Sequence, residues 1–178
     1  MSDTRHILDA VEIDRILKRM AFEILEAHKA THEVALIGIH TRGVYLARRL
    51  RENIQTFAGD FLPVGEMDIT LYRDDWTQLN AQPVVKTTDI PFMVDGKQII
   101  LVDDVLFTGR TIRAAMDALV DFGRPGRIEL AVLIDRGHRE LPIQSNYTGQ
   151  CVPTRRQDMI NVLLVESDGE DRVVLSTE

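Results

Sequence analysis

Residues 99–119 read IILVDDVLFTGRTIRAAMDAL, and this stretch decides the fold. The apolar run at 99–102 is typical of a buried strand, and it leads directly into the adjacent acids Asp103 and Asp104. A carboxylate in such a place loses its hydration unless a cation, a hydroxyl or an amide replaces the water. The acid pair, Asp103 and Asp104, is therefore predicted to lie at an edge of a sheet and to face a ligand.

The turn after the acid pair is a candidate anion site. Residues 108–111, here called the phosphate turn, precede a helix expected over about 110–122, so their amides and hydroxyls favour an anion. The sequence contains neither the Walker motif G-x-x-x-x-G-K-[ST] nor the dinucleotide motif G-x-G-x-x-G. A pentose with its 5-phosphate in this turn would place vicinal hydroxyls at the acid pair. The sequence thus predicts a site that binds sugar and phosphate together.

Strand-like and helix-like segments alternate around this stretch. Apolar residues at helical spacing predict a helix over about 13–29, with Asp9 and Glu12 as its N-terminal cap. Further strands are expected at 34–39, 63–72, 128–134, 159–165 and 172–175, and a further helix at 43–50. This order indicates an α/β fold with a mostly parallel central sheet flanked by helices.

Three polar turns follow predicted strands. They are HTRG at 40–43, DDVLFTGRT at 103–111 and DRGHRE at 135–140. Because the carboxyl ends of parallel strands share one edge of a sheet, where ligands bind, we expect these turns to meet. A polar stretch of 19 residues, 73–91, is a further candidate, since loops of that length are usually functional.

Composition limits the class of protein. A chain of 178 residues with 44% hydrophobic content is expected to form a single domain, 1–178. The net charge of -7 should repel polyanions, so any nucleic-acid site must be a local basic patch. The only cysteine, Cys151, fits a reducing cytoplasm and is interpreted as a small core residue. No signal sequence or membrane-spanning run is evident, so no membrane partner is expected.

The sequence resembles a known family. IILVDDVLFTGRT resembles the phosphoribosyl pyrophosphate (PRPP) signature of type I phosphoribosyltransferases, and HTRG matches their pyrophosphate loop. LYRDD, VLFTGRT, DALVDFGRP and LIDRGHRELPI resemble the bifunctional pyrimidine operon attenuation regulators and uracil phosphoribosyltransferases, over residues 7 to about 165.

The resemblance implies the type I phosphoribosyltransferase fold with a flexible loop. It also implies a pentosyltransferase that makes uridine monophosphate (UMP) and pyrophosphate from uracil and PRPP with Mg²⁺. By the same resemblance we expect a cytoplasmic homodimer or higher homo-oligomer that takes part in regulating pyrimidine biosynthesis genes.

The resemblance also implies residue roles. Catalytic roles fall to Asp103, Asp104, Arg42 and Arg73, with Arg73 in a loop that closes over PRPP. Residues implied in PRPP binding are Thr41, Arg42, Gly43, Asp103, Asp104, Val105, Leu106, Phe107, Thr108, Gly109, Arg110 and Thr111. Residues implied near uracil are Arg136, Gly137 and His138, with Ile160 as an apolar wall. Mg²⁺ would be bound through PRPP, and the acid pair are the only metal-ligand candidates on the protein.

Two of these positions keep alternatives open. Purine-using relatives carry an aspartate at the position of Phe107, so a purine substrate is disfavoured, and Phe107 either packs against a base or fills the core. His138 is interpreted as a hydrogen-bonded loop histidine rather than as a proton-transfer group.

The same resemblance brings a second hypothesis, an RNA-binding attenuation regulator that senses uridine nucleotides and binds pyrimidine-operon leader RNA. The basic candidates are Arg15, Lys18, Arg19, Arg139, Arg155 and Arg156. RNA-binding members tend to carry polar or basic residues where this chain has Phe22, Ala27, Gln144 and Gln150, which argues against attenuation. A third hypothesis, a metal pocket in a doubly wound signalling module, leaves the phosphate turn unexplained.

Overall fold

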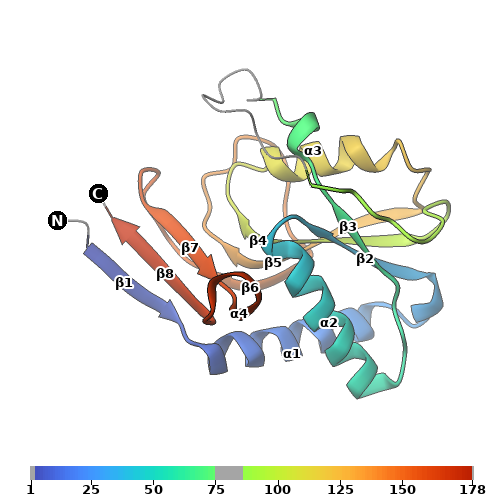
Figure 1. Cartoon of the computed structure of the whole chain (residues 1–178), viewed down its shortest axis with the longest axis horizontal. Coiled ribbons are helices and arrows are strands. Elements are labelled where there is room, and N and C mark those ends of the chain that lie inside the picture. Colours follow the sequence, from blue (N-terminus) through green and yellow to red (C-terminus); the bar gives the residue numbers. More distant parts are fainter. Residues whose placement is uncertain (1–2, 75–85, 178) are drawn as a thin grey trace.

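The computed structural model describes residues 3–74 and 86–177 (Figure 1). Its strands are β1 (Asp3–Leu8), β2 (Val34–Ile39), β3 (Val64–Met67), β4 (Gln98–Leu106), β5 (Arg127–Asp135), β6 (Tyr147–Cys151), β7 (Met159–Leu163) and β8 (Arg172–Thr177). Its helices are α1 (Ala10–Ala27), α2 (Arg42–Ala58), α3 (Arg110–Leu119) and the short α4 (Val165–Asp168). Two 3-10 turns, η1 (Thr31–Glu33) and η2 (Thr70–Tyr72), complete the described elements.

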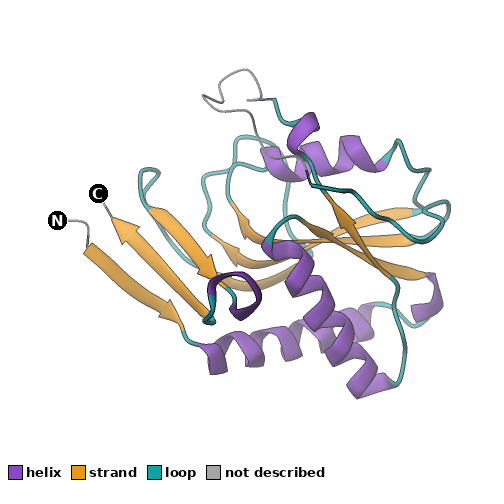
Figure 2. Ribbon diagram, in the orientation of Figure 1, coloured by secondary structure: helices purple, strands orange, loops and turns teal. Residues whose placement is uncertain are grey.

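The central sheet is parallel, as predicted. Its strand order is β3-β2-β4-β5-β6, and each pair of neighbours runs in the same direction. Figure 2 shows α1 and α2 on one face of this sheet and α3 on the other. A second, antiparallel sheet of order β1-β8-β7 lies beside it (Figure 1). The predicted α/β fold is therefore confirmed.

Burial on both faces explains the apolar sequences of the central strands. In β2, Val34 and Leu36 belong to the core cluster under α1 and α2, whereas Ala35 and Ile37 belong to the cluster under α3. Because successive side chains of a strand point to opposite faces, both sets must be apolar. The same rule gives the uninterrupted run at 99–102 in β4.

The predicted boundaries hold at some elements and are wrong at others. The helix capped by Asp9 and Glu12 is confirmed, and it begins at Ala10, three residues earlier than predicted, and ends at Ala27. The strand predicted over 63–72 is wrong beyond Met67, where β3 ends. The Asp68 carboxylate accepts hydrogen bonds from the backbone amide and the hydroxyl of Thr70, and these bonds favour the turn η2 over further strand.

Strand β4 continues past the apolar run and includes the acid pair. Asp103 lies opposite Val132 of β5, and Leu106 lies opposite Asp135, so pairing with β5 extends the strand through four more residues than predicted. The polar turn therefore begins after Leu106.

Strands β1 and β6 were not predicted, because both carry several polar residues and lack an apolar run. Strand β6 reads YTGQC and lies at the edge of the central sheet. Cys151, at its end, is exposed, so the interpretation of Cys151 as a core residue is wrong. None of the helices in 3–74 and 86–177 combines the length and the apolar character needed to cross a bilayer.

Candidate active site

The first two polar turns and the long loop meet at the carboxyl edge of the central sheet. One cavity of about 250 Å³ is lined by residues of the 40–43 turn, here called the anion loop, and by both carboxylates of the acid pair. A cavity of about 290 Å³ is lined by Asp74 and by residues 105–112, which include the phosphate turn. Both cavities are lined by Arg73, Val105 and Thr111, so they are adjacent. The structure thus brings together the acid pair, predicted to bind the sugar, and the phosphate turn, predicted to bind its phosphate.

All four residues of the phosphate turn, including Arg110, line its cavity. Gly109 is the N-cap of α3 with φ of +92°, a left-handed conformation that favours glycine. The Arg110 guanidinium is paired with two carboxylates: Nη1 lies 2.5 Å from an oxygen of Asp74, which lines the same cavity, and Nε donates to Glu140 at 2.8 Å. Any anion here would therefore be bound by amides and hydroxyls at the start of α3.

The two members of the acid pair differ in environment. Asp103 is 7% exposed, and its Oδ1 accepts a hydrogen bond of 2.9 Å from the Asp104 amide. Burial, together with the nearby charge of Asp104, raises the pKa of Asp103 well above the ordinary range. Asp104 is half-buried and lines the cavity. The arrangement therefore favours Asp104 as the carboxylate that meets a ligand.

The anion loop is fixed to the acid-bearing strand through Gly43. A Cβ atom at this position would overlap the carbonyl oxygen of Val102 in β4 and approach the Asp103 Cα to 3.2 Å. The resemblance implied a role for Gly43 in PRPP binding, where a glycine lets backbone approach a ligand closely. The structure adds a second reason, which is that α2 begins in direct contact with β4.

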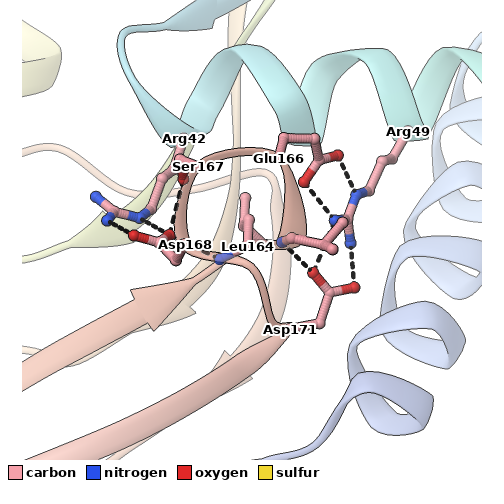
Figure 3. A network of polar contacts seen from close by, with 8 residues as sticks. Arg42, Arg49, Leu164, Glu166, Ser167, Asp168 and Asp171 are labelled. Carbon is pink, nitrogen blue, oxygen red and sulfur yellow. Dashed lines mark hydrogen bonds and ion pairs between the residues drawn. The ribbon is translucent and has the colours of Figure 1, made fainter.

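Arg42 is paired with a residue that the sequence did not indicate. Its Nε and Nη2 donate to the two carboxylate oxygens of Asp168 in α4, at 3.1 and 2.7 Å (Figure 3). This hydrogen bonding raises the pKa of Arg42 and holds the pKa of Asp168 well below its usual range. Asp168 is 126 residues away in the sequence, so no local signal could have identified it.

Lys86 is a cation at the anion loop that the sequence did not indicate. Its Nζ lies 2.5 Å from the Thr41 hydroxyl oxygen. Lys86 belongs to the polar stretch 73–91, within which residues 75–85 lie outside the described residues. The predicted closing loop falls largely on that part, while Arg73 itself lines both cavities.

Phe107 and Arg136 pack together on the side predicted to bind the base. The Arg136 guanidinium carbon lies 3.9 Å from the centre of the Phe107 ring, a cation–π contact. Phe107 is half-buried, lines the larger cavity and belongs to neither core cluster, so the interpretation that it fills the core is wrong. Arg136 is 7% exposed, and its burial lowers its pKa.

The other residues predicted near uracil separate into two places. His138 Nε2 lies 2.7 Å from the Thr154 carbonyl oxygen, which confirms a hydrogen-bonded loop histidine. Gly137 precedes it with φ of +77° and donates its amide to Asp135. Ile160 lies on β7 in the core cluster under α1 and α2, and it lines neither cavity.

The donor set at the acid pair suits Mg²⁺ only in part. Across the described ranges, no group of three or more His, Cys, Asp or Glu residues could hold a metal ion. Two carboxylates at the cavity fit a hard cation that takes its remaining oxygens from a phosphorylated substrate and water.

Five of the six basic residues predicted to bind RNA, all except Arg15, are paired with carboxylates in the described structure. The pairs are Lys18–Asp14, Arg19–Glu23, Arg139–Asp135, Arg155–Asp158 and Arg156–Glu140. Arg139 also donates to the carbonyl oxygens of Phe107 and Ile143, each at 2.8 Å. It therefore cross-links the second and third polar turns.

A parallel sheet with an acid pair in its central strand, and with the anion loop and the phosphate turn at one edge, is the arrangement expected of a protein that binds a phosphorylated sugar. A family model described as phosphoribosyl transferase domain matches residues 3–163. Bifunctional protein PyrR of Elusimicrobium minutum is 57% identical over 169 residues, which are 95% of this chain and 94% of that protein. Bifunctional protein PyrR of Thermus aquaticus is also 57% identical, over 95% of this chain and 93% of that protein's length. The chain therefore belongs to the PyrR-type branch of the phosphoribosyltransferase family.

Solved structures agree on the fold. A hypoxanthine-guanine phosphoribosyltransferase from Bacillus anthracis superposes with a TM-score of 0.73 at 17% identity, over 98% of each chain. A hypoxanthine phosphoribosyl transferase from Trypanosoma cruzi gives a TM-score of 0.74 at 16% identity, over 98% of this chain and 91% of that one.

Proposed function

We propose that this phosphoribosyltransferase transfers the 5-phosphoribosyl group of PRPP to uracil, giving UMP and diphosphate. The carrying observation is the placement of the acid pair, the anion loop and the phosphate turn around adjacent cavities. PRPP has a diphosphate at one end, a phosphate at the other and two hydroxyls between them. These groups match the anion loop, the phosphate turn and the acid pair, in that order. Phe107, at a position where purine-using relatives carry aspartate, favours a pyrimidine.

In the proposed reaction, N1 of uracil forms a bond to C1 of the ribose while the bond from C1 to the diphosphate oxygen breaks. The bonding electrons leave with diphosphate, and the N1 proton passes to solvent. Positive charge develops on the ribosyl ring, where Asp104 would stabilise it. Arg42 and Lys86, at the anion loop, would neutralise the departing diphosphate. Mg²⁺, when bound, would supply charge neutralisation at the diphosphate and ribose oxygens, with the acid pair as its protein ligands.

On the base side, the Phe107 ring and the backbone of 136–138 are proposed to contact uracil. The Arg136 guanidinium fixes the Phe107 ring from one face. Because Arg136 also donates to the carbonyl oxygens of Arg155 and Arg156, at 3.1 and 3.2 Å, its own position is set by the chain after β6. The base side would therefore be rigid before substrate binds.

Base preference tests this proposal. Purified protein with Mg²⁺ and PRPP should release diphosphate with uracil at a rate at least 100-fold above that with orotate, hypoxanthine or adenine, in line with the discrimination that a polar base pocket gives. Diphosphate release that needs hypoxanthine or adenine instead of uracil would contradict it. The reaction without any base is the control for PRPP hydrolysis.

The protein is also proposed to regulate pyrimidine gene expression by binding leader RNA, with UMP as effector. The observation that favours this second role is the similarity to relatives named bifunctional over nearly their whole length. Because five of the six predicted basic residues are paired with carboxylates, binding should be weak and strongly dependent on salt.

Leader RNA tests this regulatory role. We expect the protein to bind the leader RNA of its own pyrimidine operon at low salt, at least tenfold more tightly than unrelated RNA of equal length, a ratio well below that of dedicated sequence-specific binders. UMP should tighten binding further, and filter-binding titrations with and without UMP measure both effects. Equal affinity for the two RNAs would contradict the regulatory role.

Three further expectations stay predictions. We propose a homodimer or higher homo-oligomer, a single domain over 1–178, and a cytoplasmic location, where PRPP and nascent leader RNA are available.

A further inference from the structure

The connection between β7 and β8 places three acids against α2 (Figure 3). Glu166 and Asp171 both bind Arg49: Glu166 accepts from its Nε and Nη2 at 2.9 and 2.6 Å, and Asp171 accepts from its Nη1 and Nη2 at 2.8 Å. Asp168 alone binds Arg42, seven residues nearer the start of α2. One connection thus holds two arginines of one helix through separate carboxylates.

Asp168 is itself held in place. Its Oδ2 accepts hydrogen bonds from the Leu164 amide at 2.9 Å and from the Ser167 hydroxyl at 2.7 Å. These bonds and the Arg42 guanidinium keep the pKa of Asp168 low, so the residue is ionised at neutral pH. The carboxylate is therefore a fixed, permanently charged partner for Arg42.

The pair leaves part of the Arg42 guanidinium for other contacts. The Asp168 carboxylate accepts hydrogen bonds from Nε and Nη2 of Arg42. Figure 3 shows the remaining terminal nitrogen pointing away from the Asp168 carboxylate. Arg42 lines the same cavity as Asp104, whose charge also raises the pKa of Arg42. A guanidinium bound along one edge in this way has lost its rotational freedom before any ligand arrives.

We propose that Asp168 is a positioning residue that fixes the Arg42 guanidinium for the diphosphate group of PRPP and of the product. This inference rests on the proposed function, because it assigns Arg42 to that group. Partners that orient a ligand-binding side chain are typically worth 10- to 100-fold in affinity, although they do not touch the ligand.

Asp168→Asn tests the proposal with Glu166→Gln as its matched control. Each substitution removes one charge from the same short connection, but Glu166 contacts Arg49 and not Arg42. We expect Asp168→Asn to raise the KM for PRPP and the Kd for Mg-diphosphate about tenfold. The KM for uracil at saturating PRPP should change less than twofold, and Glu166→Gln should change none of these constants by more than twofold. Steady-state kinetics and calorimetric titration with Mg-diphosphate measure them.

Several outcomes separate this proposal from its alternatives. An equal loss in both variants would show that the connection only needs docking onto α2, and would overturn the positioning role. Tighter Mg-diphosphate binding by Asp168→Asn would identify Asp168 as a competitor of the ligand, and unchanged constants would show that it is not needed. Failure of the unsubstituted protein to bind Mg-PRPP or Mg-diphosphate would instead overturn the proposed function itself.

Discussion

Replacing Asp104 with asparagine lowers kcat for uridine monophosphate formation by about 10²- to 10³-fold, the usual effect of removing one preorganised group that stabilises transition-state charge. The reason is that asparagine keeps the shape of the side chain and loses the charge that faces the developing ribosyl cation. The KM for uracil should change little, because the base contacts other residues. Initial rates of diphosphate release at saturating PRPP measure the effect.

Asp103→Asn is the matched control for that variant. Asp103 is 7% exposed, whereas Asp104 is half-buried, so asparagine at Asp103 replaces the carboxyl that a ligand reaches less easily. We expect a loss of kcat of about tenfold or less, since one hydrogen-bonding group is altered without removing the main charge. A larger loss in Asp103→Asn than in Asp104→Asn would reverse the assignment of the two carboxyls. Thermal melts check that both variants fold.

Gly43→Ala is expected to lower the free energy of unfolding by about 3 kcal/mol, at the upper end for an overpacked core. A methyl group there would overlap the Val102 carbonyl oxygen, and backbone cannot move aside as a side chain can. Alanine is otherwise favoured over glycine inside a helix by about 1 kcal/mol, so any loss reflects the contact. Urea denaturation followed by circular dichroism measures it.

Gln55→Ala serves as the control on the same helix. Gln55 is exposed near the end of α2, and alanine there should change stability by less than about 0.5 kcal/mol. If Gly43→Ala were as stable as Gln55→Ala, the close packing of α2 on β4 would be wrong. PRPP binding should also weaken in Gly43→Ala, because the displaced helix carries Arg42 with it.

The sequence predicted features that depend on neighbouring residues in the chain. The boundaries of β2 were predicted at 34–39, because a short apolar run between polar residues has few alternatives. The acid pair and phosphate turn were predicted for a similar reason, since the strand, the turn and the helix start all lie within 99–119. Two residues of this stretch, Val105 and Thr111, line both cavities in the structure, together with Arg73.

Features that depend on distant residues were not predicted. The Arg42–Asp168 pair joins positions 126 residues apart, and nothing near either residue indicates the other. Edge strands such as β6 bury little apolar surface, so they lack the pattern by which strands are recognised. The place of Phe107 depends on Arg136, which arrives from the end of the next strand.

The contact of Gly43 with β4 has a consequence for substrate choice. Because helix and strand are packed closely there, we expect the anion loop and the acid pair to keep the same separation when a ligand binds. A compound that contacts both the anion loop and the acid pair must be long enough to span the distance between them. Ribose 5-phosphate lacks the diphosphate at C1, so it could contact the acid pair but not the anion loop. Selectivity for PRPP would then come from the fixed distance between these two parts of the site.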